Sequence, residues 1–205
     1  MKTARRMRSP AAGMIIVALV AACAGAPPLT PFSTGDEEAP ERGFAVLVGA
    51  RDLEAESDFG STDEQPLGGA ELHWARPGAP LALELGLSYS TDADEPSLAP
   101  ELETEVADLG LGLRYRFTDL GVFHPYLAGG LALLYGRTES EGPGFPTTED
   151  TDWDGGVYAH GGVWAPFGDD LRLGLDLRWV GSDWIESDGL DLDHTAIALT
   201  FGTGF

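Results

Sequence analysis

Apolar and polar residues alternate along much of this chain, and the pattern is clearest at residues 171–179, LRLGLDLRW. Successive side chains of an extended strand point to opposite faces of a sheet. The stretch therefore places four leucines and Trp179 on one face, and two arginines, Gly174 and Asp176 on the other. An apolar face backed by a charged one is typical of a membrane barrel strand, with lipid outside and a narrow polar lumen inside.

The same period of two recurs from Gly43 to the C-terminus, so the sequence predicts eight strands. None of the positions predicted to face outward carries a charge. The predicted strands are 44–51, 68–74, 81–90, 107–117, 126–136, 153–167, 171–179 and 194–205.

Short and long connections alternate between these segments. The short ones contain RPGAP, TDLGVFH and APFGDD, which are rich in the Gly, Pro and Asp of tight turns. The long ones, 52–66, 91–105, 137–153 and 181–194, are interpreted as loops of about 13 to 17 residues. The predicted fold class is all-β, an eight-stranded antiparallel up-and-down transmembrane β-barrel. Short turns and both termini would be periplasmic, and the long loops extracellular.

The N-terminus has the layout of a secretory signal peptide over residues 1–22. Four basic residues and no acidic ones accompany an apolar run at 14–22 that is too short to span a membrane as a helix. Removing these four charges takes the formal net charge from −22 to about −26. A polyanion of that size is not expected to bind nucleic acid.

Cys23 is the only cysteine, and it directly follows the apolar run. The sequence VAAC resembles the bacterial lipobox, which implies that Cys23 is lipidated as the first residue of the mature chain. The alternative is an ordinary signal-peptide cut after Ala24, which would discard the cysteine. Residues 23–42, rich in proline and poor in apolar periodicity, are predicted to be a flexible tether, and 43–205 the barrel domain.

These features together resemble the small OmpA/OmpX-type outer-membrane β-barrel proteins. The resemblance covers about 43–205 and rests on the alternating runs GLGLRYRF and LRLGLDLRW, on aromatic residues near strand ends, and on the terminal Phe205. It implies location in the cell outer membrane, contact with outer-membrane lipids and recognition by the barrel-assembly machinery. Phe201 and Phe205 would form the assembly signal, although Thr203 stands where the family usually has an apolar residue.

Charged residues at the predicted inward positions define a candidate site. Five are basic and five acidic, and an unpaired charge is costly in an interior of low dielectric, so we expect a paired network. An eight-stranded barrel has room only for side chains, which disfavours an open pore. The ten residues are Arg51, Glu71, Glu84, Asp108, Arg114, Arg116, Asp154, Arg172, Asp176 and Arg178.

The four predicted loops hold 22 acidic residues and one basic residue, Arg137. One interpretation is a solvated, self-repelling surface. The other is a site for Ca²⁺ or Mg²⁺, which prefer carboxylate oxygens; no other cofactor is expected. Asp150, Asp152 and Asp154 match the first half of a calcium-loop signature, but Gly161 stands where the closing glutamate should be.

No catalytic residue is predicted, because GxSxG, HExxH, P-loop and CxxC motifs are all absent. His194, near Asp191 and Asp193, could act as a base with a carboxylate partner, but no motif supplies a nucleophile beside it. The predicted function is a non-enzymatic barrel with a structural or surface-interaction role and an unknown surface partner. The alternatives are a barrel that binds a small molecule or a divalent cation and, third, a lipid-modifying outer-membrane enzyme. A soluble lipocalin-like barrel is disfavoured, because its apolar stripes would have to face inward.

Overall fold

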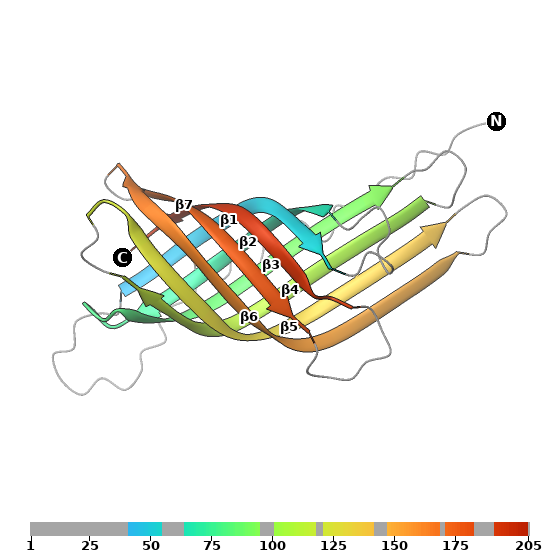
Figure 1. Ribbon diagram of the computed structural model, residues 1–205, viewed down its shortest axis with the longest axis horizontal. Helices are drawn as coiled ribbons and strands as arrows, with labels where there is room; N and C mark the ends of the chain where they lie inside the picture. The colour runs from blue at the N-terminus through green and yellow to red at the C-terminus, as the bar shows by residue number, and fades with distance from the viewer. Residues whose placement is uncertain are drawn as a thin grey trace. The chain divides into compact units, whose positions relative to one another are not determined.

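Eight antiparallel strands form a closed barrel in the computed structural model (Figure 1). The structure describes residues 41–54, 64–94, 101–117, 121–141, 147–168, 171–182 and 191–204. Each strand pairs with the next along the chain, and β8 pairs with β1 to close the barrel, so the predicted fold class is confirmed. The strands are β1 Glu41–Leu53, β2 Glu64–Ala75, β3 Leu81–Asp94, β4 Glu101–Arg116, β5 His124–Glu141, β6 Thr148–Phe167, β7 Leu171–Gly181 and β8 His194–Thr203.

The two faces of the barrel wall differ as the alternation predicts. The four leucines of β7 are 42 to 63% exposed on the outside, whereas Asp176 between them is 1% exposed. An apolar outer wall suits a surrounding of lipid hydrocarbon. The closed barrel also leaves no strand edge whose backbone groups would lie unpaired in lipid. Among the described residues, no helix is long and apolar enough to cross a membrane.

Most strands are longer than the sequence analysis predicted, and the largest extensions are in β4, β5 and β6. β4 begins at Glu101 instead of 107, β5 continues to Glu141 instead of 136, and β6 begins at Thr148 instead of 153. The predicted loops at 91–105 and 137–153 are therefore largely strand, and six residues separate β3 from β4 and β5 from β6. The predicted strict alternation of short and long connections is wrong. In these extensions most residues on both faces are polar, so the pairing continues without the hydrophobic period that would reveal it.

The two ends of the barrel differ in connections and in charge. We call one the turn end, because it holds the connections 76–80, 117–123 and 168–170 and the outer limits of the first and last strands, Glu41 and Thr203 (Figure 1). The opposite end, the acidic end, holds the strand extensions. Its described carboxylates are Asp52, Glu54, Glu64, Asp92, Glu103, Glu105, Glu139, Glu141, Glu149, Asp150, Asp152, Asp191 and Asp193.

Candidate functional site

The lumen gathers charged side chains from six of the eight strands, because strand alternation turns every second residue inward. The exceptions are β5 and β8, whose inward positions hold no aspartate, glutamate, lysine or arginine. Arg51, Glu71, Glu84, Asp108, Arg114, Asp154, Asp176 and Arg178 are all buried in the interior. These are eight of the ten residues that the sequence analysis placed there.

Glu71 and Arg114 are at the centre of this network. Arg114 Nη2 lies 2.5 Å from Glu71 Oε2, and Arg114 Nε donates to Glu84 Oε2 at 2.6 Å. The second oxygen of Glu71 accepts a hydrogen bond from Arg178. The guanidinium of Arg114 also lies 4.0 Å from the centre of the Tyr126 ring. Charge-assisted bonds of this kind tie β2, β3, β4 and β7 together across the lumen.

His160 bridges two carboxylates in the same layer. Its Nδ1 lies 2.6 Å from Asp176 Oδ2, and its Nε2 lies 2.8 Å from Glu84 Oε1. Tyr126 donates its hydroxyl hydrogen to Asp176, and Tyr158 donates to Glu84 at 3.1 Å. His160 on β6 and Asp176 on β7 are therefore hydrogen-bonded by neighbouring side chains.

A second polar cluster lies nearer the acidic end, around Arg51. This arginine bonds to Asp108 and Ser88, donates to Ser90 Oγ at 3.0 Å and donates to the carbonyl oxygen of Val106 at 3.2 Å. Ser90 in turn donates to Gln65 Oε1 at 2.6 Å. Arg51 is thus fixed by four acceptors, which makes it a structural cation and not one available to a ligand.

Buried apolar side chains pack together in the lumen on the acidic-end side of the ion pairs and around the Arg51 cluster. They come from β1, β4, β5, β6, β7 and the segment before β8, and all but two are 1% exposed or less. We call this cluster the apolar plug. Its members are Leu53, Val106, Ala132, Leu134, Tyr158, Val180 and Leu192. An apolar constriction of this kind opposes the passage of water and ions.

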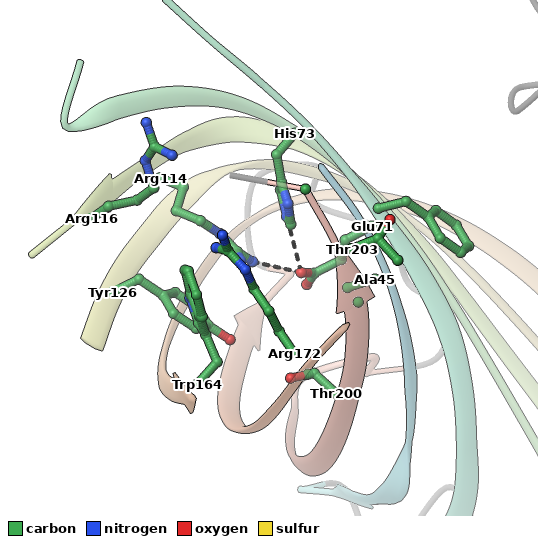
Figure 2. Close-up of a pocket in the computed structure, with 13 residues that line it drawn as sticks. Ala45, Glu71, His73, Arg114, Arg116, Tyr126, Trp164, Arg172, Thr200 and Thr203 are labelled. Atoms are coloured by element: carbon green, nitrogen blue, oxygen red, sulfur yellow. Dashed lines mark hydrogen bonds and ion pairs between the residues drawn. The ribbon is translucent and has the colours of Figure 1, made fainter. Parts of the chain in front are cut away.

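The turn end, in contrast, keeps a small pocket, shown in Figure 2. Its volume is about 40 Å³, room for a few water molecules and far less than a ligand cavity needs. Arg116 lies at this mouth, 3.2 Å from Glu41 Oε2 and 2.5 Å from the carbonyl oxygen of Ala79. Arg172 lies beside it with its guanidinium 3.8 Å from the centre of the Trp164 ring.

The structure therefore separates the ten predicted lumen residues into different roles. Seven belong to the two buried clusters, while Asp154 is buried with its Oδ1 accepting from the backbone of Gly155. Arg116 and Arg172 lie at the turn-end mouth and are only partly buried. Sequence reasoning missed the partner of Arg116, because Glu41 precedes the expected start of the barrel at Gly43.

Metal binding in the lumen is opposed by the arginines. Glu71, His73 and Glu84 could in distance terms hold one ion, as could Glu71, His160 and Asp176. Arg114 already occupies the oxygens of Glu71 and Glu84 in the first group, and Arg178 bonds to Glu71 in the second. A cation would have to displace a guanidinium from each group.

Asp150, Asp152 and Asp154 do not lie in a loop. They alternate along β6, whose extended backbone spaces side chains on one face by about 6.7 Å. Asp154 is buried in the lumen, whereas Asp150 is exposed at the acidic end. The extended backbone does not wrap these carboxylates around one ion as a calcium loop does.

His194, which the sequence analysis considered as a base, does not use the carboxylate of Asp193 as its partner. His194 is fully buried, with Nδ1 2.9 Å from the carbonyl oxygen of Leu192 and Nε2 3.8 Å from Asp108 Oδ2. Asp193 instead accepts from the backbone and hydroxyl of Ser182, each at 2.6 Å. The neighbouring Asp193 is therefore engaged by Ser182 and not by this histidine.

Two other predictions fall partly outside the described residues. Cys23 and the whole of 1–40 are not among them, and neither is Phe205. Phe201 is described, and it lies 50% exposed on the outer face of β8.

A closed antiparallel barrel with an apolar outer wall and an ion-paired interior defines a transmembrane β-barrel. The family model for the outer membrane protein beta-barrel domain matches residues 15–205, and the chain belongs to that family. This membership supports location in the outer membrane. Among curated proteins, no sequence matches this chain.

Several solved barrels have a similar fold at low sequence identity. A major outer membrane protein from Thermus thermophilus is 13% identical with a TM-score of 0.60, covering 82% of this chain and 100% of its own. Neisserial surface protein A is 10% identical with a TM-score of 0.56, covering 83% and 100%. Ail of Yersinia pestis, solved in complex with the heparin analogue sucrose octasulfate, is 8% identical with a TM-score of 0.54, covering 81% and 97%. Identities this low show a shared fold and nothing about shared ligands.

Proposed function

We propose that this protein is a non-enzymatic outer-membrane barrel that conducts nothing and acts through its acidic end, either by stabilising the membrane or by contacting surface partners. The observation that carries the proposal is the sealed lumen. The apolar plug closes one end, and ion pairs fill the layers beneath it. The pocket at the turn end has a volume of only about 40 Å³, which is too small for a substrate.

Conductance across a planar bilayer tests this proposal. The refolded wild-type protein should give no sustained open channel, because an ion would have to cross both the plug and the paired charges. A variant with Leu53, Leu134 and Val180 all replaced by alanine removes plug volume and should raise the frequency of brief openings. Sustained conductance by the wild-type barrel would overturn the closed-lumen assignment.

The acidic end supports an orientation with that end outside the cell and the turn end in the periplasm. It has the two longest intervals between strands, and long connections are extracellular in barrels of this type. Maleimide labelling of intact cells tests it with two single-cysteine probes. Asp191→Cys should be labelled, and Arg76→Cys in the turn between β2 and β3 should not. Labelling of the Arg76 probe alone would reverse the orientation.

The negative charge of the acidic end restricts the partners that it can bind. Ail was solved with a polysulfated sugar. Thirteen described carboxylates against Arg137 make a similar polyanion an unfavourable partner here. Partners with basic groups, or with bound cations between them and this surface, fit the charge instead.

A divalent-cation role is the second candidate, and cross-strand pairing favours it. Glu103 on β4 is opposite Glu139 on β5, which is opposite Glu149 on β6. Like charges directly opposite one another destabilise a sheet. Arg137 partly offsets them, with Nη2 2.8 Å from Glu139 and Nε 3.0 Å from Glu149. A bound Ca²⁺ would relieve the remaining repulsion.

Thermal unfolding with and without millimolar Ca²⁺ separates the two candidates. A cation site at the glutamate row predicts a rise in melting temperature that a triple Glu103, Glu139 and Glu149→Gln variant loses. Replacing Glu54, which directly follows β1, and Glu64, on β2, with glutamine controls for general charge screening and should leave the rise intact. Equal responses in all proteins would leave only the surface-interaction role.

A further inference from the structure

The turn-end pocket is lined by one arginine, Arg172, that forms no ion pair with the described residues. Figure 2 shows Arg172 entering the pocket beside Trp164, near the pair formed by Arg114 and Glu71. Arg172 Nη1 is buried and has no hydrogen-bond partner among the described residues. Burying a charged donor without an acceptor is costly, so such groups usually have a partner.

The other charges of the pocket are already paired. Glu71 is the only described carboxylate in its lining, and it is bonded to Arg114, Arg178 and His73. Arg116, at the mouth, is bonded to Glu41. Among the arginines that line the pocket, Arg172 is therefore the one without an ion pair to any described residue.

The surroundings of Arg172 hold its guanidinium ready for an acceptor. Its plane packs over Trp164 at 3.8 Å, a cation–π contact that restricts the side chain. Thr200, Thr203 and Gly204 also line the pocket, which adds hydroxyl and backbone groups. The planar fork of an arginine matches the two oxygens of a carboxylate or phosphate.

We propose that the turn-end pocket binds one oxyanion group, a phosphate or a carboxylate, through Arg172. The volume of about 40 Å³ fits a single such group and excludes a whole metabolite, so a larger ligand would insert only its anionic group. The apolar plug closes the other end of the lumen, so the ligand enters from the turn end. The source is a free anion or the headgroup of an anionic lipid.

Tryptophan fluorescence and calorimetry of the full-length barrel in maltoside micelles test the proposal, because this detergent carries no phosphate. Inorganic phosphate or acetate, titrated at constant ionic strength against chloride, should give a saturable signal. Arg172→Gln should weaken the affinity about tenfold or more, as expected for losing hydrogen bonds to a charged group. Arg76→Gln removes an equal charge from an exposed turn at the same end and should leave binding unchanged.

Two further arms identify the source and guard against misfolding. If a short-chain phosphatidylglycerol binds more tightly than inorganic phosphate, the ligand is a lipid headgroup; the reverse order indicates a free anion. Arg172→Lys keeps the charge but loses the fork, so it should bind more weakly than wild type and more tightly than Arg172→Gln. If Arg172→Gln does not fold, the affinity of Arg172→Lys is compared with that of the wild type instead. Absence of a saturable signal in the wild type, or equal loss in the Arg76 variant, would overturn the proposal.

Discussion

Replacing Glu71 with glutamine should destabilise the barrel more than any conservative change on its surface. Glu71 is 1% exposed and lies 2.5 Å from Arg114, with Arg178 on its other oxygen and His73 Nε2 at 3.2 Å. Glutamine has the same shape but no charge, and its amide would bring a donor toward two arginines. Removing one partner of a buried ion pair costs about 3–5 kcal/mol.

The carboxylates that remain in the Glu71→Gln variant still pair with one of the two arginines, so the loss of stability should lie in the lower part of that range. Arg114 keeps its bond to Glu84 at 2.6 Å. The nearest other oxygens to Arg178 are 3.9 Å away on Asp176 and 4.0 Å away on Asp108, too far for full compensation. We therefore expect a decrease of about 3 kcal/mol in the free energy of unfolding.

Urea titration of the protein refolded into vesicles measures this change, followed by tryptophan fluorescence and by the mobility shift on boiling in SDS. Glu64→Gln, on an exposed position of the same strand, is the matched control and should change stability by less than about 0.5 kcal/mol. The double variant with Arg178→Met should be less destabilised than the sum of the single variants, by about 0.5–3 kcal/mol. A Glu71→Gln barrel as stable as the control would refute the network as a source of stability.

Three further changes test other parts of the fold by the same titration. Leu134→Ala in the apolar plug should cost about 2–5 kcal/mol, and lipid-facing Leu131→Ala clearly less; equal losses would contradict a packed plug. Gly130→Val should prevent refolding, because even a Cβ would come within 2.2 Å of a β4 carbonyl oxygen. Gly68→Ala is the control: its Cβ meets nothing within 4 Å, so this variant should refold normally. A Gly130→Val protein that still shows the heat-dependent mobility shift would show that the strands can separate. Leu175→Arg on the outer face should cost about 2–4 kcal/mol in a bilayer, and no change there would place that position outside the hydrocarbon region.

The sequence alone determined the wall of the barrel. A period of two is a local property of each strand, so it can be read without knowing the partner strand, and it places Glu84, Asp108 and Arg114 inside correctly. The same reasoning failed at the acidic end, where most residues of the strand extensions are polar. There the pairing of Glu105 with Arg137 continues the sheet, but no apolar stripe marks it.

Tertiary structure decided which charges meet and which are left over. Glu71 and Arg178 are 107 residues apart, and only the register and closure of the barrel bring them into contact. Equal numbers of acids and bases predict pairing in general, but the count cannot show that Arg116 takes Glu41 while Arg172 stacks on Trp164. Pairing depends on height along the barrel axis, which strand register sets and local sequence does not encode.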